Sequence, residues 1–404
     1  MGRTLMGSER ADGSRRTRVA HVPRNIGGNT AGLSDALELL GFESEMISSV
    51  GDPFGFSANG VAPPGLVGEL RRVLSIPRIL LTHDVIHYNA GTTIAMPALP
   101  LSRTQIRRHP FRFLVTEAHS WLMELVQLLE LTAARALRRT LVMTFQGDDA
   151  RQGDVSLRHF EESIAHHVDD SYYNPRSDRA KRRRIVRYER FGVRMLALNP
   201  DLLHVLPVGS RFIPYTNVDV SEVIADDPTV DQRKEPRVLR IAHAPSHRAA
   251  KGTAQIIDAV ESLQNDGFPI QLVLVENESN TVARQLIAHA DVLIDQLYAG
   301  WYGGVAVEAM AAGVPVLSYI REGDLHFVPE AMVKDMPIIR TTSSRVRDSL
   351  LEFLALSGFE RCQLSDSSRS YVRRWHNPRL IASQVADLYG ENMHENTSRR
   401  RLGD

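Results

Sequence analysis

Short uninterrupted apolar runs alternate along the chain with longer segments in which apolar residues recur every three or four positions. A short apolar run is typical of a strand buried on both faces, and the longer periodicity is typical of a helix with one buried face. The strand-like runs are residues 17–22, 42–48, 84–89, 141–145, 238–243, 270–275, 292–295 and 314–320. Their alternation with helical segments predicts an α/β fold built on parallel sheets.

The pattern is clearest around residue 300, where an apolar strand leads into a glycine-rich loop and then a helix. Gly303 and Gly304 allow the backbone to lie close to a ligand. The amide groups at this helix start, including those of Gly303, Gly304 and Val305, are suited to binding phosphate. Glu308 lies about one turn further along the same side, where it could accept hydrogen bonds from a ribose. The alternative is an ordinary strand–helix–strand crossover with a surface glutamate.

The segment from Glu308 to Val316, Glu-Ala-Met-Ala-Ala-Gly-Val-Pro-Val, carries a resemblance to a known family. It is similar to the end of the nucleotide-sugar motif of retaining glycosyltransferases of the GT-B fold, in the large family 4. That motif usually has two glutamates separated by seven residues. The spacing falls here on Gly300, or on Ala299 with one inserted residue, and neither is acidic. Asp295 is the nearest acidic candidate for the role of the first glutamate.

The resemblance implies two facing Rossmann-like domains, a cleft between them and a C-terminal helix that crosses back to the first domain. A length of 404 residues also favours two domains, because single cores rarely grow to that size. The predicted parts are a disordered segment 1–16, an acceptor-side domain 17–216, a linker 217–236, a nucleotide-sugar-binding domain 237–374, a crossover helix 375–390 and a disordered polar tail 391–404.

The family also carries a lysine and an arginine after the first strand of its second domain, where they hold the donor diphosphate. Lys251 matches the lysine, and Arg248 is the candidate for the arginine. With Glu308, these are the expected catalytic residues. In the first domain, Gly27 and Gly28 resemble the family's glycine loop, which faces donor and acceptor across the cleft. A tight turn with no ligand is the alternative for this pair.

Polar residues at other strand ends are candidates for the sugar or acceptor side, because ligands in open α/β sheets bind outside the carboxyl ends of the strands. The candidates are Asn89, Thr92, Gln146, Asp149, Arg151 and Asp295. The loop from Gln146 to Arg151 resembles a family loop in which a histidine occupies the place of Gln146. His87, inside a strand, is expected to be a core histidine.

Two arginine-rich segments each allow two interpretations. In the segment 103–139, arginines precede and follow an apolar run, which fits either an interfacial amphipathic helix or a pair of helices packed on the first sheet. The basic segment 176–190 fits either a solvated helix face or a surface for anionic headgroups or a pyrophosphate-linked acceptor. Both leave open a peripheral contact with an anionic membrane.

Composition narrows the class of protein. With 43% hydrophobic and 24% charged residues the chain is globular, and a formal net charge of zero gives no support for nucleic-acid binding. Only four of the 48 basic residues are lysines, so Lys251 is conspicuous. One cysteine, Cys362, excludes an internal disulfide and fits a reducing compartment. No secretory signal is expected in residues 1–16, and the predicted location is the cytoplasm, with the inner face of the membrane as an option.

The resemblance implies a retaining glycosyltransferase of the hexosyltransferase type that needs no metal and no cofactor. Its expected partners are a UDP- or GDP-sugar donor and a glycan, lipid-linked or small-molecule acceptor. One rival is a nucleotide-sugar epimerase of the same fold, which should show an acid/base pair in the cleft. Another is a catalytically silent sugar-nucleotide-binding subunit, which the missing first glutamate suggests.

Overall fold

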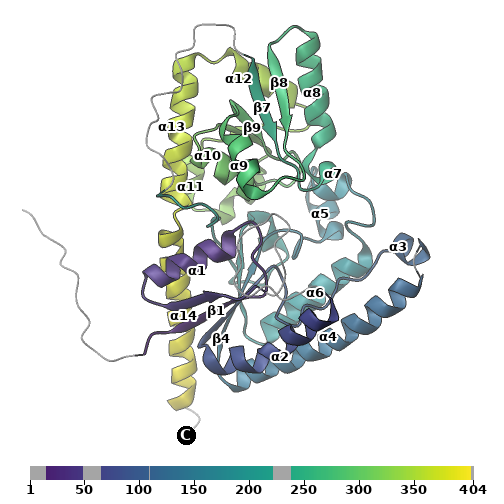
Figure 1. Ribbon diagram of the computed structural model, residues 1–404, viewed down its shortest axis with the longest axis vertical. Helices are drawn as coiled ribbons and strands as arrows, with labels where there is room; N and C mark the ends of the chain where they lie inside the picture. The colour runs from purple at the N-terminus through teal and green to yellow at the C-terminus, as the bar shows by residue number, and fades with distance from the viewer. Residues whose placement is uncertain (1–14, 49–64, 109, 222–237, 402–404) are drawn as a thin grey trace, which may run out of the picture.

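The computed structural model describes residues 15–48, 65–108, 110–221 and 238–401. Within them the chain forms two parallel sheets, one in each half, and helices flank both (Figure 1). The predicted α/β class with two Rossmann-like domains is therefore confirmed. Most of the predicted segment 1–16 and of the predicted linker 217–236 lies outside the described residues.

The first sheet has the strand order β2-β1-β3-β4-β5-β6, and all its pairings are parallel. Its strands are β1 (Arg18–Val22), β2 (Glu43–Met46), β3 (Val85–Asn89), β4 (Thr140–Phe145), β5 (Arg194–Ala197) and β6 (Arg211–Phe212). Every residue of β3 and β4 is buried, because helices cover both faces of the sheet.

The first domain contains the helices α1 (Asn29–Leu39), α2 (Leu66–Thr82), α3 (Arg103–Arg108), α4 (Pro110–Ala136), α5 (Gly153–His159) and α6 (Pro175–Arg190), and the short 3-10 helices η1 (Ile164–His166) and η2 (Pro200–His204). Helices α2, α4 and α6 pack on one face, where Leu80, Leu131 and Tyr188 share a core. Helix α1 packs on the other face.

The second sheet has the order β11-β10-β9-β7-β8, again parallel. Its strands are β7 (Leu239–His243), β8 (Ile270–Leu274), β9 (Val292–Ile294), β10 (Val316–Ser318) and β11 (Ile339–Arg340). Its helices are α7 (Arg248–Lys251), α8 (Thr253–Asn265), α9 (Asn280–Ala288), α10 (Gly304–Ala311), η3 (Glu322–Phe327), α11 (Glu330–Asp335), α12 (Val346–Ala355) and α13 (Gly358–Trp375). Helices α8 and α12 pack together beside one face, and α10 packs against α13 beside the other.

The last helix, α14 (Pro378–Arg401), returns to the first domain and lies beside α1 (Figure 1). His87 Nδ1 lies 2.6 Å from the hydroxyl of Tyr389 on this helix, so His87 is a core histidine, as predicted. Residues 391–401, predicted as a disordered tail, instead continue α14. Gly390 does not end the helix, because it keeps a negative φ and an interior glycine costs only about 1 kcal/mol relative to alanine.

The two arginine-rich segments differ from each other. Helix α4 buries one side on the sheet, as the core-helix interpretation predicted, but its opposite side is exposed, with Trp121 at 75%. In α6, Lys181 and Arg184 are buried, and Arg184 Nη2 donates to the carbonyl of Ala98 at 2.7 Å. A fully solvated basic face is therefore not what α6 presents. No helix among the described residues is long and apolar enough to cross a bilayer.

Candidate functional site

The glycine-rich loop predicted to bind phosphate lies where β9 ends and α10 begins. Asp295 directly follows β9, Gly303 caps the N-terminus of α10, and Lys251 ends α7, which follows β7. Strands β7 and β9 are neighbours in the sheet, so their carboxyl ends bring these three residues together. This is the position at which an open α/β sheet binds its ligands.

Lys251, Asp295 and Gly303 form one contact group, here called the lysine cluster. Lys251 Nζ lies 2.8 Å from Asp295 Oδ1, and the amide of Gly303 donates to Asp295 Oδ2 at 2.5 Å. The Asp295 side chain is fully buried, whereas that of Lys251 is 14% exposed. A Cβ on Gly303 would lie 3.4 Å from Lys251 Nζ, so the loop backbone comes directly up to the ammonium. An ammonium carries three donors, which allows Lys251 to hold Asp295 and a ligand together.

Glu308 lies in α10 one turn beyond Gly304, and amides from two other segments reach its carboxylate. Asn217 Nδ2 and Asn280 Nδ2 lie 3.4 and 3.3 Å from its Oε1. Burial raises the pKa of Glu308, and Asn280, Arg284 and Asn217 partly offset that rise. Asn217 also donates to the carbonyl of Gly304 at 3.1 Å, so the end of the first domain contacts the start of α10. Two carboxylate oxygens can accept about four hydrogen bonds, which leaves capacity for sugar hydroxyls.

Arg248, predicted to share the diphosphate with Lys251, points to a different partner. Its Nε and Nη2 lie 2.8 and 2.5 Å from the two carboxylate oxygens of Glu276, after β8. Its side chain is 58% exposed and lines an open hollow of about 410 Å³ with Thr253 and Tyr298. Within the described residues Arg248 is therefore not joined to the lysine cluster, and it would have to leave Glu276 to reach the diphosphate.

Gly27 and Gly28 have φ angles of 58° and 76°, the left-handed conformation that glycine adopts most readily, and Gly28 caps the N-terminus of α1. The next residue, Asn29, accepts from the amide of Thr216 at 3.0 Å and from its hydroxyl at 2.7 Å. Thr216 precedes Asn217, which reaches Glu308. Short contacts therefore connect the first-domain glycine loop to the start of α10.

The loop after β4 is held together by its own side chains. The carboxylate of Asp149 accepts from the amides of Gln146 at 3.0 Å, Gly147 at 2.7 Å and Ala150 at 3.1 Å. Burial raises the pKa of Asp149, and the amides of Gln146 and Gly147 partly offset the rise. These contacts give Asp149 a role in shaping the loop.

Arg151 is equally occupied. Its Nε and Nη2 bind the two oxygens of buried Asp201 at 2.6 and 3.1 Å, and its Nη1 binds Asp148 at 2.9 Å. Gln146 differs, since its side-chain Nε2 is enclosed and has no hydrogen-bond partner among the described residues. Of the predicted residues in this loop, Gln146 is the one with a donor left for a ligand.

Asn89 and Thr92 lie beside that loop but are also turned inward. Asn89 donates to the carbonyl of His87 at 3.1 Å, and both side chains are buried. A Cβ on Gly91 would lie 2.9 Å from Cβ of Asp149, so the turns after β3 and β4 are in contact. Asn89 therefore helps to shape this edge of the sheet, and the place of Asn89 and Thr92 on the sugar or acceptor side stays a prediction.

Sequence reasoning missed Asp148, which forms the centre of a polar group at the domain boundary. The hydroxyls of Tyr172 and Tyr173 both donate to it, in addition to Arg151. Burial by itself would raise the pKa of Asp148, but Arg151 and the tyrosines outweigh burial and lower it. The Tyr172 ring lies 4.7 Å from the ring of His247 in the second domain. Adjacent acidic residues and adjacent tyrosines were visible in the sequence, but only the fold joins them.

Gly300, where the family spacing would put the first glutamate, has no room for a side chain. Its φ is 83°, and a Cβ there would lie 2.5 Å from Nη1 of Arg321. The guanidinium is fixed by Asp324 at 2.8 Å and by the carbonyl of Glu162 at 2.9 Å, and it lies 3.8 Å from the centre of the Phe160 ring. An arginine therefore fills the space over Gly300, and the carboxylate bound to that arginine is that of Asp324.

A second contact group lies where the chain passes between the domains. The Tyr302 hydroxyl lies 2.9 Å from His376 Nε2 and 2.9 Å from the Tyr371 hydroxyl, and His376 Nδ1 lies 3.1 Å from the carbonyl of Tyr215. Burial lowers the pKa of His376 to about 4, so the ring is neutral at pH 7. Tyr302 directly precedes Gly303. The lysine cluster is thus adjacent in the sequence to the contact group at the domain crossing.

Among the described residues, no three His, Cys, Asp or Glu side chains are grouped so that they could hold a metal ion. The positive groups of the site are the Lys251 ammonium and the first amides of α10.

No protein-family model and no curated protein matches the sequence. Among solved structures, the chain is similar to a glycosyltransferase from Rickettsia africae ESF-5, with a TM-score of 0.53 and 12% identity over 94% of this chain and 99% of that chain. It is similar to a sucrose-phosphate synthase from Thermosynechococcus elongatus, with a TM-score of 0.49 and 14% identity over 94% of this chain and 100% of that chain. It is also similar to WaaG, a glycosyltransferase involved in lipopolysaccharide biosynthesis, with a TM-score of 0.49 and 14% identity over 90% of this chain and 98% of that chain. At 12% identity the similarity to the Rickettsia africae structure concerns architecture, and the chain has the two-domain GT-B fold.

Proposed function

We propose that this chain is a retaining glycosyltransferase that takes a sugar from a nucleoside-diphosphate-sugar. The observation that carries the proposal is the lysine cluster at the start of α10, with Glu308 one turn further on. A diphosphate at that helix start would meet the Lys251 ammonium and the amides of Gly304 and Val305, which have no partners within the helix. A ribose joined to it would come within reach of Glu308.

The same groups can lower the barrier to transfer. As the bond between the sugar and the diphosphate breaks, negative charge grows on the departing phosphate oxygen. Lys251 and the α10 amides are fixed beside that oxygen and stabilise the transition state more than the ground state. Because they supply this positive potential themselves, the proposed reaction is metal-independent.

Asp295 takes a positioning role in this proposal. Both of its oxygens are engaged, one by Lys251 and the other by the amide of Gly303. It therefore holds the cation and the loop in register instead of contacting the sugar.

The acceptor side is assigned to the first domain, where Gln146 and the Asp148 group lie. Thr104 of α3 donates to Asp170 at 2.8 Å, and Asp170 lies two residues from Tyr172, whose ring contacts His247. Helix α3 therefore borders the domain boundary. This arrangement favours a glycan or lipid-linked acceptor that approaches along α3, with a UDP- or GDP-sugar as the donor.

A donor screen tests the proposal. Purified protein is titrated with UDP, GDP and their sugar conjugates, while melting temperature and release of free sugar are followed. At a hundredfold excess over the Kd, a bound nucleotide stabilises the protein by about 2.7 kcal/mol, which is a shift of a few degrees. Binding without transfer or hydrolysis would identify a silent binding subunit, and a changed sugar configuration without release would identify an epimerase. No response to any nucleotide would refute the donor site.

A further inference from the structure

Helix α4 carries an apolar stripe on the side that faces away from the sheet. The exposed members are Phe111, Leu114, Val115, Trp121, Leu122, Leu125, Leu128 and Leu129. They recur every three or four residues, so they share one face of the helix. The opposite face, with Met123, Gln127 and Leu131, is buried toward the first sheet. A surface helix normally shows the reverse order, with its polar residues outward.

Helix α2 carries a second stripe beside the first. Val67, Leu70, Leu74 and Leu81 are 59 to 66% exposed and lie three, four and seven residues apart. The two helices pack side by side, and His119 Nε2 of α4 lies 2.8 Å from Glu69 Oε2 of α2. Both bury their inner sides in the same core, so both stripes face outward together. These two stripes are called the α2–α4 face below.

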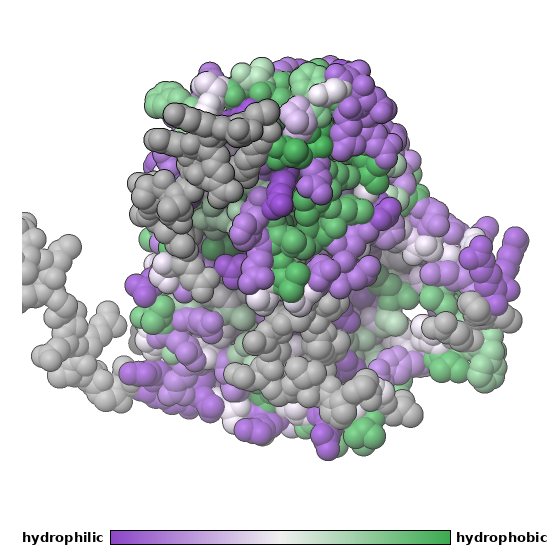
Figure 2. Space-filling view, turned by 45° about the horizontal axis from the view of Figure 1, so that its top comes forward, coloured by the Kyte–Doolittle hydropathy of each residue, from purple (hydrophilic) through white to green (hydrophobic). Residues whose placement is uncertain are grey.

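Exposed arginines surround this face. Arg71 and Arg78 lie on α2, and Arg103, Arg107 and Arg108 are three of the six residues of α3, which precedes α4 in the chain. The acidic residues of α4 do not offset them, because Glu117 is bound to Arg176 at 2.9 Å and Glu124 to Arg187 at 3.4 Å. In Figure 2, hydrophobic and hydrophilic side chains lie next to one another where α3 and α4 project from the molecule, on the right.

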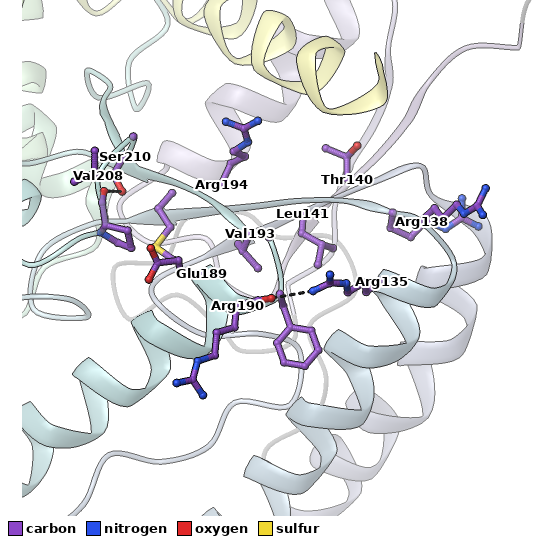
Figure 3. A pocket seen from close by; sticks show the side chains of 16 residues that line it. Arg135, Arg138, Thr140, Leu141, Glu189, Arg190, Val193, Arg194, Val208 and Ser210 are labelled. Carbon is purple, nitrogen blue, oxygen red and sulfur yellow. Dashed lines mark hydrogen bonds between the residues drawn. The ribbon is translucent and has the colours of Figure 1, made fainter. Parts of the chain in front are cut away.

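An arginine-lined hollow lies at the other end of α4. It measures about 570 Å³ and is lined by Arg135, Arg138, Arg139, Arg190 and Arg194, with Glu189 as its one acidic residue. Figure 3 shows Arg135 at the end of α4, Arg138 just after it, Arg190 at the end of α6 and Arg194 in β5. Arg135 Nη1 donates to the carbonyl of Arg190 at 2.9 Å. Cations therefore lie at both ends of a helix that is about 40 Å long.

We propose that the α2–α4 face docks on an anionic lipid bilayer, lying in the interface with its leucines and Trp121 among the acyl chains. The surrounding arginines would then reach lipid phosphates, since long cationic side chains extend toward headgroups while their stems stay in apolar surroundings. The charges argue against a second copy of this chain as the occupant. A two-fold pairing of this face would bring the arginines of both copies together, while Glu69, Glu117 and Glu124 are already paired within each copy.

The test is flotation of the full chain with vesicles of phosphatidylcholine alone and of phosphatidylcholine mixed with phosphatidylglycerol. The chain is expected to float with the anionic vesicles and to do so far less with the neutral ones. Leu125→Glu should lower the partition of the protein onto vesicles at least about tenfold, because it puts a charge where a leucine would lie among the acyl chains. Phe359→Glu, at a site 72% exposed in the second domain, is the matched control and should float like the parent.

Two further measurements separate the electrostatic from the apolar contribution to binding. Arg71→Ala and Arg78→Ala should each weaken binding to anionic vesicles about fivefold and leave binding to neutral vesicles unchanged. Arg345→Ala, in the second domain, is the control. Trp121 fluorescence should shift to the blue on binding and be quenched by brominated acyl chains, and Trp121→Phe should lose most of that quenching.

Three outcomes would overturn the proposal. One is no flotation with anionic vesicles by parent protein that melts normally. Another is equal loss in the Leu125→Glu and Phe359→Glu variants. The third is a dimer in light scattering that Leu125→Glu dissociates, which would make a second copy the occupant. None of these readouts depends on transferase activity, so the docking proposal stands or falls separately from the proposed function.

Discussion

Replacing Glu308 by glutamine separates a ligand-binding role from a structural one. Glutamine keeps an oxygen for Asn217 and Asn280 and removes the charge. Burial raises the pKa of Glu308 above its usual 4.5, because the buried site favours the protonated form. Glu308 therefore contributes most to the free energy of unfolding below pH 4.5, and this contribution is lost as the pH rises through the raised pKa. Glu308→Gln removes the ionisable group and with it this loss of stability, so at pH 7 the variant should be at least as stable as the parent.

The structure sets the scale of the remaining effects. The two hydrogen bonds to Oε1 are 3.4 and 3.3 Å long, near the limit for such bonds, so each contributes at most about 0.5 kcal/mol. Glu308→Ala loses both and should cost about 1 kcal/mol before the relief of the buried charge is counted. Charge-assisted hydrogen bonds to a ribose are worth about 1.5 to 3 kcal/mol, so donor affinity should fall roughly 10- to 150-fold in both variants, with alanine the worse.

The assay combines calorimetric titration of UDP and GDP, steady-state turnover, and melting curves at pH 7 and pH 4.5. Glu261→Gln, an exposed glutamate on α8, is the control for charge and should match the parent throughout. The stability difference between parent and Glu308→Gln should shrink toward pH 4.5. A Glu308→Gln protein that melts several degrees lower at pH 7 but binds and turns over donor normally would refute the reasoning, because Glu308 would then be a structural residue.

Three other changes have defined outcomes. Lys251→Met leaves Asp295 buried without its cation and should lower the free energy of unfolding by about 3 kcal/mol. The double variant Lys251→Met with Asp295→Asn should recover much of that stability but still bind nucleoside diphosphate at least about tenfold more weakly than the parent. Parent-like affinity of the double variant in calorimetry would remove Lys251 from the site. Turnover should persist in excess chelator, and reversible loss restored by magnesium would contradict the role given to Lys251 and the α10 amides. Burial raises the pKa of Glu130 to about 7, so its contribution to stability is present below pH 4.5 and is lost as the pH rises through 7. In denaturant titrations across that pH range, Glu130→Gln should lose less stability than the parent. Equal losses in the two proteins would contradict the raised pKa of Glu130.

The local pattern of the second domain was sufficient to predict the fold and the place of the candidate site. Strand, glycine loop and helix follow one another within a short stretch, and turn chemistry specifies their boundaries to within a few residues. The pairing of Lys251 with Asp295 was not predictable, because it joins the ends of two strands that are distant in sequence and adjacent in the sheet. The same limit applies to Arg248, whose charge suits phosphate but whose side chain reaches Glu276.

The first domain shows a different limit. Asp149 and Arg151 follow a strand end, as ligand-binding residues do. However, Asp149 accepts hydrogen bonds from the amides of its own loop, and Arg151 binds Asp201. Sequence gives the position of a polar residue, and only the structure gives its partners. The sequence also left open whether the outer side of α4 is buried. A helix that is apolar on two sides has the same sequence pattern whether one side or both sides are buried.

The hydrogen bond from His376 to the carbonyl of Tyr215 has a mechanical consequence. The polypeptide passes between the two halves twice, and this bond brings both passages to one place beside α13 and α14. We expect any rotation of one half against the other to pivot near this bond, with the largest movement on the opposite flank, where α7 lies (Figure 1) and contacts η1. In the proposed function this pivot lies next to the loop that would hold the donor phosphates, because Tyr302 directly precedes Gly303, so opening of the two halves would change that part of the site least.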